Sequence, residues 1–106
     1  MEIIRMNELE GKKNMRGVVT KQLINHDNTR VMNLTLAPGD EVPQHKVPVD
    51  VFFYVVSGKG TIQIGEDKAL VTAEDIIVCP PNTNMALWAD QGEKFSVLNI
   101  KTPNIK

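Results

Sequence analysis

The chain has 106 residues, and its 12 lysines and arginines nearly balance 13 aspartates and glutamates, which gives a formal net charge of −1. This length is typical of one domain, which we expect to span residues 1–106. A nearly neutral surface offers no electrostatic footprint for nucleic acid or for an anionic membrane, so neither is expected as a partner. The longest apolar run, residues 51–56, is far too short to span a membrane.

The first residues contain no apolar stretch typical of a signal peptide. Cys79 is the only cysteine, so no disulfide can form within the chain. A single cysteine fits a reducing compartment, and we therefore expect a cytoplasmic protein.

In chain order, the sequence predicts many short strands separated by turns. One helical turn at most is expected at residues 6–13. A strand at residues 16–25 is followed by a turn at 26–29, and residues 30–36 then alternate, with Met32, Leu34 and Leu36 on one face. The further short strands, with their closing turns, are expected at residues 51–60, 61–67, 68–71, 75–81, 85–90 and 95–100.

Roughly eight to ten strands, with turns about every 8–12 residues, predict an all-β domain, a small antiparallel β-barrel or jelly roll. The strand at residues 51–56 is apolar on both faces. One face holds Val51, Phe53 and Val55, and the other holds Phe52, Tyr54 and Val56. Such a strand is covered on both faces, and large apolar patches are uncommon on monomers. We therefore expect a homodimer, with coverage by the chain's own terminal strands as the alternative.

Residues 39–58 resemble the first motif of the cupin family, in which a glycine, a His-x-His pair, a glutamate and a second glycine follow one another at fixed spacing. Gly39, His45 and Gly58 stand at that spacing. Residues 74–89 resemble the second motif, with Asn82 where the family has a glycine, and asparagine tolerates positive φ. The resemblance implies a small single-domain cupin of the RmlC-like kind, a double-stranded β-helix.

The metal-binding positions of the family are largely replaced. In metal-binding cupins the two histidines and the glutamate of the first motif, with the histidine of the second, hold the ion. The residues here at those positions are His45, Val47, Val51 and Met85. A first-row divalent metal normally needs at least three nitrogen, oxygen or sulfur ligands. We therefore expect no metal and no cofactor, and an apolar pocket that contains one imidazole.

The predicted function is metal-independent binding of a small, mostly apolar molecule, with a carbonyl or carboxylate facing His45 as the orienting group. Leu34 and Leu36 are expected to complete an apolar lining. The residues expected to contact the ligand are His45, Val47, Val51, Phe53, Met85, Met32 and Cys79.

Two other functions stay open. The first is a cupin-type enzyme (a dioxygenase, isomerase or epimerase) that uses His45 with a non-standard ligand set, although the sequence offers no clear partner to orient that histidine. The second is a structural or regulatory subunit whose barrel is filled by side chains. The sequence therefore leaves open whether the chain is an enzyme.

Several single residues allow two interpretations. Cys79 is either a buried, inert thiol or a nucleophile whose pKa is lowered by a neighbour. Together with His45 and Met85 it also forms a soft set of the kind that Cu(I) prefers, with core packing as the alternative. Trp88 either anchors a subunit interface or packs beneath a loop.

The remaining charged candidates are expected on the surface. Asp50 precedes the family's glutamate position, and strand alternation directs it outward. His26 falls in a turn. The basic residues Lys12, Lys13 and Arg16 are expected to form a solvated face, because no aromatic residues are interleaved with them.

Overall fold

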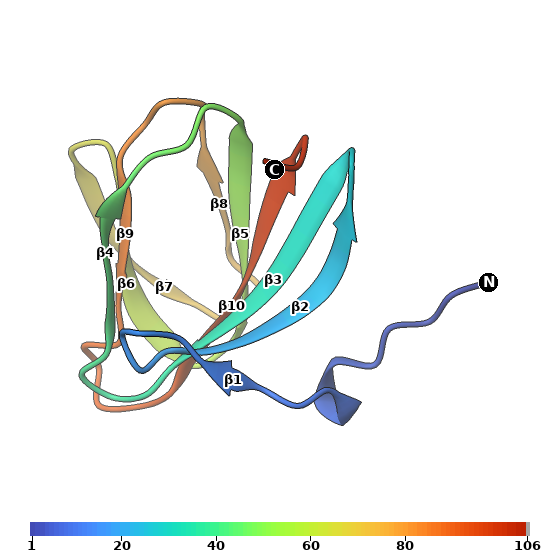
Figure 1. Ribbon diagram of the computed structural model, residues 1–106. Coiled ribbons are helices and arrows are strands. Elements are labelled where there is room, and N and C mark those ends of the chain that lie inside the picture. The colour runs from blue at the N-terminus through green and yellow to red at the C-terminus, as the bar shows by residue number, and fades with distance from the viewer. Residues whose placement is uncertain (106) are drawn as a thin grey trace.

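The computed structural model describes residues 1–105. In this part of the chain, short strands form two antiparallel sheets that face each other as a barrel with one wide end (Figure 1). The elements are η1 (Met6–Glu8), a 3-10 turn, and the strands β1 (Lys12–Lys13), β2 (Val19–His26), β3 (Thr29–Leu36), β4 (Glu41–His45), β5 (Asp50–Ser57), β6 (Lys59–Ile64), β7 (Asp67–Thr72), β8 (Ile76–Cys79), β9 (Met85–Trp88) and β10 (Phe95–Thr102). The predicted all-β antiparallel barrel is confirmed.

The two sheets differ in size. The larger has the strand order β1-β2-β3-β10-β5-β8, and the smaller has the order β4-β9-β6-β7. The last strand, β10, lies at the centre of the larger sheet, between β3 and β5. Pairing of this kind joins segments far apart in the sequence, so the barrel closes only when the whole chain is folded.

No helix among residues 1–105 is long and apolar enough to cross a membrane. The 3-10 turn η1 agrees with the single helical turn expected near the start of the chain.

The strand β4 contains a proline, Pro43. The sequence predicts no regular strand here. A proline has no N–H to donate to a sheet and is therefore confined to edges and irregular positions. Both conditions hold here, because β4 is an edge strand of the smaller sheet and its pairing with β9 shifts register between Val42 and His45.

The motif positions adopt the backbone conformation that their residues suggest. Gly39 and Gly58 have φ of +91° and +79°, and a Cβ at Gly58 would collide with the carbonyl oxygen of Lys94. Asn82 has φ of +59°, which confirms that asparagine replaces the family's glycine in the left-handed region. Glu74, at the other glycine position of the second motif, also has a positive φ, of +75°.

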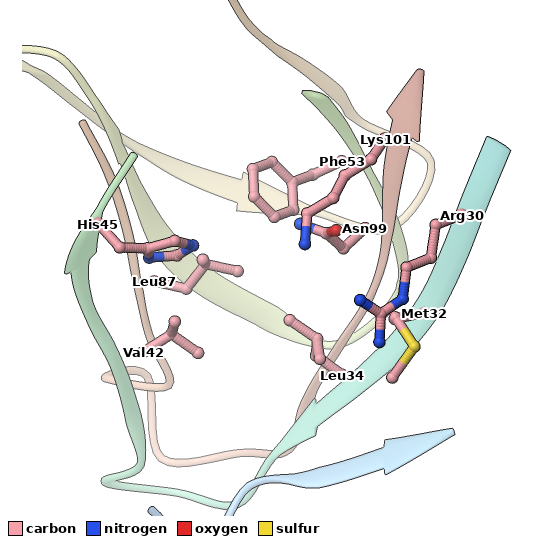
Figure 2. A pocket seen from close by; sticks show the side chains of 9 residues that line it. All are labelled: Arg30, Met32, Leu34, Val42, His45, Phe53, Leu87, Asn99 and Lys101. Carbon is pink, nitrogen blue, oxygen red and sulfur yellow. The ribbon is translucent and has the colours of Figure 1, made fainter. Parts of the chain in front are cut away.

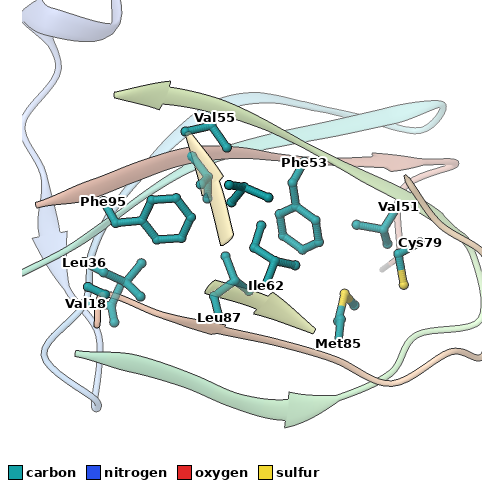
Figure 3. Close-up of a cluster of buried hydrophobic side chains, with 13 residues drawn as sticks. Val18, Leu36, Val51, Phe53, Val55, Ile62, Cys79, Met85, Leu87 and Phe95 are labelled. Carbon is teal, nitrogen blue, oxygen red and sulfur yellow. The ribbon is translucent and has the colours of Figure 1, made fainter. Parts of the chain in front are cut away.

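The core lies between the sheets and is formed by inward-facing side chains of both (Figure 3). In β5 the alternation is as predicted: Val51, Phe53 and Val55 are buried, whereas Phe52 on the opposite face is 37% exposed. The side chains that fill the core are Val18, Leu36, Val51, Phe53, Val55, Ile62, Val71, Cys79, Met85, Leu87, Ala89, Phe95 and Val97.

The outer face of the larger sheet is open at β5 and β8, whereas Val31 and Ile100 on the same face of β3 and β10 are buried. Ile76 and Val78 of β8 are 64% and 67% exposed beside Phe52. The N-terminal segment lies beside β2 instead (Figure 1), where Lys21 Nζ donates to the carbonyl oxygen of Met6 at 3.0 Å. The described terminal segments therefore leave this apolar face exposed.

The positive φ of Glu74 generates a stability prediction. A side chain with a Cβ is disfavoured in the left-handed region by about 1–2 kcal/mol. Glycine removes this penalty, but part of the gain in stability is lost because glycine increases the conformational entropy of the unfolded chain. Glu74→Gly should therefore stabilise the protein by up to about 1 kcal/mol in urea denaturation. Glu93→Gly, in an exposed bend without a positive φ, is the control and should destabilise. A lower free energy of unfolding in Glu74→Gly than in the wild type would contradict the inference that the backbone at Glu74 is strained.

Candidate functional site

A cavity opens at the wide end of the barrel, between the two sheets (Figure 2). Its volume is about 190 Å³. Strands of both sheets contribute to its wall. The lining residues are Arg30, Met32 and Leu34 of β3, Val42 and His45 of β4, Phe53 of β5, Leu87 of β9, and Asn99 and Lys101 of β10.

The polarity of the barrel interior changes along its axis. The strands β3 and β10 are antiparallel neighbours, and every second residue of each faces inward. The inward-facing pairs, from the closed end to the open end, are Leu36 with Phe95, Leu34 with Val97, Met32 with Asn99, and Arg30 with Lys101. Along β3 and β10 the wall is therefore apolar at the closed end and cationic at the mouth.

His45 lies at the mouth on the smaller sheet, across the cavity from Arg30 and Lys101 (Figure 2). Its Nδ1 atom is 3.0 Å from the carbonyl oxygen of Pro43. When Nδ1 donates to that oxygen in the neutral ring, Nε2 is left as an acceptor. The imidazole is exposed, so it can meet a ligand at the entrance.

The cation on β10 is only partly hydrated. Burial lowers the pKa of the Lys101 amine, and the charge of Arg30 lowers it further. Arg30 and Lys101 are direct partners in the β3–β10 ladder. Two like charges in this position destabilise a sheet, so the mouth of the cavity holds an unfavourable pair.

The structure brings together only some of the residues predicted to bind a ligand. His45, Phe53 and Met32 line the cavity. Val51, Met85 and Cys79 are instead at most 1% exposed and belong to the core. They lie at the same open end, because Val51 is the ladder partner of both Lys101 and Cys79, and Met85 is the partner of His45, but they do not line the cavity. Val47 is half-buried and packs against that core, whereas Leu36 is a member of it.

Cys79 is shielded from the cavity. Its Sγ atom lies 3.6 Å from the carbonyl oxygens of Pro80 and Thr83, and burial raises the pKa of the thiol. The side chain is therefore uncharged at neutral pH, which is unfavourable for a nucleophile or a metal ligand.

Sequence reasoning missed five lining residues, and three of these are polar. The missed residues are Arg30, Val42, Leu87, Asn99 and Lys101. Strand alternation contained a signal for the three polar ones, because Arg30 shares a face with Met32, and Asn99 and Lys101 share one with Val97. What the sequence did not show is that β3 and β10 are neighbours.

The other candidates lie outside the cavity. Trp88 is half-buried on the outer face of the smaller sheet, where its Nε1 donates to Glu41 Oε2 at 3.0 Å and Lys68 Nζ lies 4.6 Å from the ring centroid. His26 and Asp50 are exposed, as expected, although His26 is the last residue of β2 and does not lie in the turn expected at residues 26–29. The basic residues Lys12, Lys13 and Arg16 are exposed as well.

The residues at the metal-binding positions of the resemblance do not fit a divalent metal. His45 supplies a nitrogen, but Val47 and Val51 have no donor atom and thioether sulfur, as in Met85, is a soft ligand. Among residues 1–105, no group of three or more histidine, cysteine, aspartate or glutamate side chains is placed to hold an ion. The polar side chains that line the cavity are Arg30, His45, Asn99 and Lys101, and of these only His45 is a common metal ligand.

Comparison with known proteins identifies the architecture. A family model described as "Cupin domain" matches residues 32–101. No curated protein matches the sequence. Similar solved structures include KdgF from Halomonas sp. (TM-score 0.91, 17% identity, covering 100% of this chain and 96% of that one). An RmlC-like cupin from Shewanella frigidimarina has a TM-score of 0.87 (16% identity, 96% and 90% covered), and a predicted oxalate decarboxylase from Thermotoga maritima has 0.85 (20% identity, 97% and 100% covered).

The charge pair at the mouth generates a stability prediction. Lys101→Met keeps most of the aliphatic stem and removes the repulsion, so it should stabilise the free protein by about 0.2–1 kcal/mol at neutral pH. Because the pKa of Lys101 is lowered by folding, the penalty is fully present below that lowered pKa and disappears as the pH rises past the ordinary value of about 10.5. The advantage of the variant should therefore shrink in alkaline solution.

Urea denaturation at several pH values measures this effect. Lys59→Met, which removes an exposed lysine on β6, is the matched control and should change stability little. A Lys101→Met variant less stable than the wild type at neutral pH would show that the amine has a stabilising partner.

Proposed function

The chain belongs to the cupin family, and we propose that it binds one small organic molecule in the cavity at the open end of its barrel, without the help of a metal ion. The observation that supports this most is the cavity itself, about 190 Å³ in volume and lined from both sheets. An apolar cavity of about 150 Å³ is enough to hold benzene, so a ligand of about six to ten non-hydrogen atoms fits. A barrel filled by its own side chains would lack such a space.

The lining suggests how a ligand is oriented. The half-buried side chains of Leu34 and Val42 offer apolar surface for its hydrocarbon part, and the buried core residues Phe53 and Leu87 lie behind them in the wall. His45 offers a ring nitrogen at the entrance for a polar group. Together these features favour a small molecule that is apolar along its body and polar at its ends.

A specific observation supports a second candidate, a metal-free cupin enzyme. His45 and Lys101 face the cavity from opposite sheets, and each can exchange a proton with a ligand. Among proteins of similar fold, one is named as a predicted oxalate decarboxylase. Proton NMR of a bound compound in D₂O distinguishes the candidates, because a binding protein leaves the carbon-bound hydrogens of the compound in place.

Blocking the cavity tests the binding function. A thermal-shift screen of small aliphatic and aromatic acids, amides and alcohols, in buffer with a chelator, should identify compounds that raise the melting temperature. At a concentration of 100 times the Kd, binding contributes about 2.7 kcal/mol of stability. Leu34→Trp, which places an indole in the cavity, should abolish the shift.

Leu70→Trp is the matched control, because Leu70 is exposed on β7 and away from the lining. This variant should respond to the same compounds as the wild type. The proposal fails if no compound shifts the melting temperature, or if the shift persists in a folded Leu34→Trp variant.

We also propose that a second copy of the chain covers the outer face of β5 and β8 in the larger sheet. Phe52, Tyr54, Ile76 and Val78 form an uncharged surface on the neighbouring strands β5 and β8. Because a two-fold contact places the same patch on both subunits, an uncharged patch brings no repulsion between copies. Stable interfaces bury about 800 Å² from each partner, and exposed apolar side chains in the centre supply most of the binding energy.

Sedimentation equilibrium tests this association. The wild type should be a dimer, and Val78→Glu should be a folded monomer because it introduces a charge into the centre of the patch. Leu70→Glu changes an equally apolar and exposed residue on the other sheet and should remain a dimer. A monomeric wild type, or a dimer that tolerates Val78→Glu, would contradict the proposed interface.

A further inference from the structure

The strongest unexplained feature of the molecule is the cationic wall of the cavity, formed by Arg30, Lys101 and Asn99 at the open end of β3 and β10 (Figure 2). Among the described residues that line the cavity, none is acidic. The two cations are direct partners across the ladder, so the free protein carries their mutual repulsion in a partly desolvated place. An anion between them would turn this repulsion into attraction.

The guanidinium of Arg30 has unused hydrogen-bonding capacity. Its Nε atom is buried and has no hydrogen-bond partner among residues 1–105. A buried donor without an acceptor is costly, and this cost is recovered when a ligand supplies the acceptor. Arginine is well suited to this role, because its planar fork matches the two oxygens of a carboxylate.

Asn99 adds a neutral donor next to the cations. It lies one inward-facing position below Lys101 on β10, between Met32 of β3 and Phe53 of β5. It is only 6% exposed, and no hydrogen bond joins its side chain to another described residue. Its amide can therefore donate to an oxygen held by the two cations.

We infer that Arg30, Lys101 and Asn99 bind the carboxylate of a small amphipathic monocarboxylate whose apolar body lies on Leu34 and Phe53. This inference rests on the proposed function of the same cavity and names its ligand class. The limited volume of the cavity favours a compact planar carboxylate over a larger anion. It also reverses the orientation expected from the sequence, since the carboxylate lies at the wall opposite His45.

His45 then meets the other end of the ligand. The cavity separates it from the cationic wall, and its Nδ1 is engaged by Pro43. Its Nε2 can accept a hydrogen bond from a hydroxyl group at the far end of the carboxylate. The inferred ligand class is thus a short carboxylic acid with an apolar middle, and a distal hydroxyl group should improve its binding.

Isothermal titration in low-salt buffer with a chelator tests the inference. The probes are isovalerate and benzoate, each with its neutral isostere, isovaleramide or benzamide. At least one acid should bind, and its amide should bind about tenfold more weakly or worse, because hydrogen bonds to charged groups are stronger than neutral ones. A titration with 4-hydroxybenzoate tests the role of His45. If this compound binds more tightly than benzoate, the difference in affinity should disappear in His45→Ala.

The variants separate charge from shape. Arg30→Met and Lys101→Met should each weaken binding of the acid by about tenfold without changing that of the amide. Arg30→Lys keeps the charge but loses the planar fork, and it should bind the acid less well than the wild type. Arg16→Met and Lys59→Met remove exposed cations outside the cavity and should leave the affinity unchanged.

A second measurement reports on Lys101 directly. A bound carboxylate should raise the pKa of its amine, which NMR of ¹³C-labelled lysine follows at the Cε atom. The charged and titratable groups of the described residues that face the cavity are Arg30, His45 and Lys101, so repetition in His45→Ala shows whether the change at Lys101 depends on His45. An unchanged Lys101 pKa in the presence of a bound acid would overturn its assigned role.

The outcomes distinguish this inference from the function on which it rests. If acids and amides bind equally, and Arg30→Met binds both as the wild type does, the cavity binds small molecules but the carboxylate site is wrong. If inorganic phosphate competes as well as the best acid, the site holds anions in general and the inferred ligand class is wrong. If neither acids nor amides bind, the proposed function and the carboxylate site both fail.

Discussion

The position of β10 between β3 and β5 is the constraint on which the rest of the structure depends. This strand pairs with both neighbours over most of its length, and the register decides which of its side chains enter the barrel. A shift by one residue would direct every side chain to the opposite face. Phe95 and Val97 would then leave the core, and Asn99 and Lys101 would leave the cavity. Folding and the candidate site therefore depend on the same backbone pairing.

Along β10 the sequence specifies the two ends of the barrel differently. Phe95 and Val97 are fully buried and close one end with apolar packing, whereas Asn99 and Lys101 line the cavity at the other. A protein tolerates polar groups inside a barrel only where they are satisfied or solvated. At the wide end the polar groups are solvated, because the cavity is open to water. A ligand can therefore reach the cations there without unfolding the core.

The sequence predicted the fold well because its signals are local. Alternation in residues 51–56 placed Phe53 inward and Phe52 outward, and the substitution at Asn82 foretold a positive φ. The cavity was harder to predict, because alternation shows which face a residue lies on but not which inward-facing side chains the neighbouring strands cover. Met85 and Met32 both face inward, and Met85 is the ladder partner of His45, yet Met85 is fully buried in the core and only Met32 lines the cavity.

The cationic wall escaped prediction for a related reason. Arg30 and Lys101 are far apart in the sequence and become neighbours only through the β3–β10 pairing, which no local pattern shows. The positions of the family resemblance drew attention instead to Val47 and Val51, where the chain has lost its donor atoms. Both residues are apolar and pack in or against the core, and the cation nearest to Val51 is its own ladder partner on the same sheet, Lys101.

The central claim is that this cavity works without a metal ion, and elemental mass spectrometry of the untagged, purified protein tests it most directly. The account predicts only traces of metal, and no uptake after incubation with Fe(II), Mn(II), Ni(II), Zn(II) or Cu(I) followed by desalting. A close to stoichiometric content that His45→Ala removes would contradict it, because His45 would then belong to a ligand set that the described geometry does not contain.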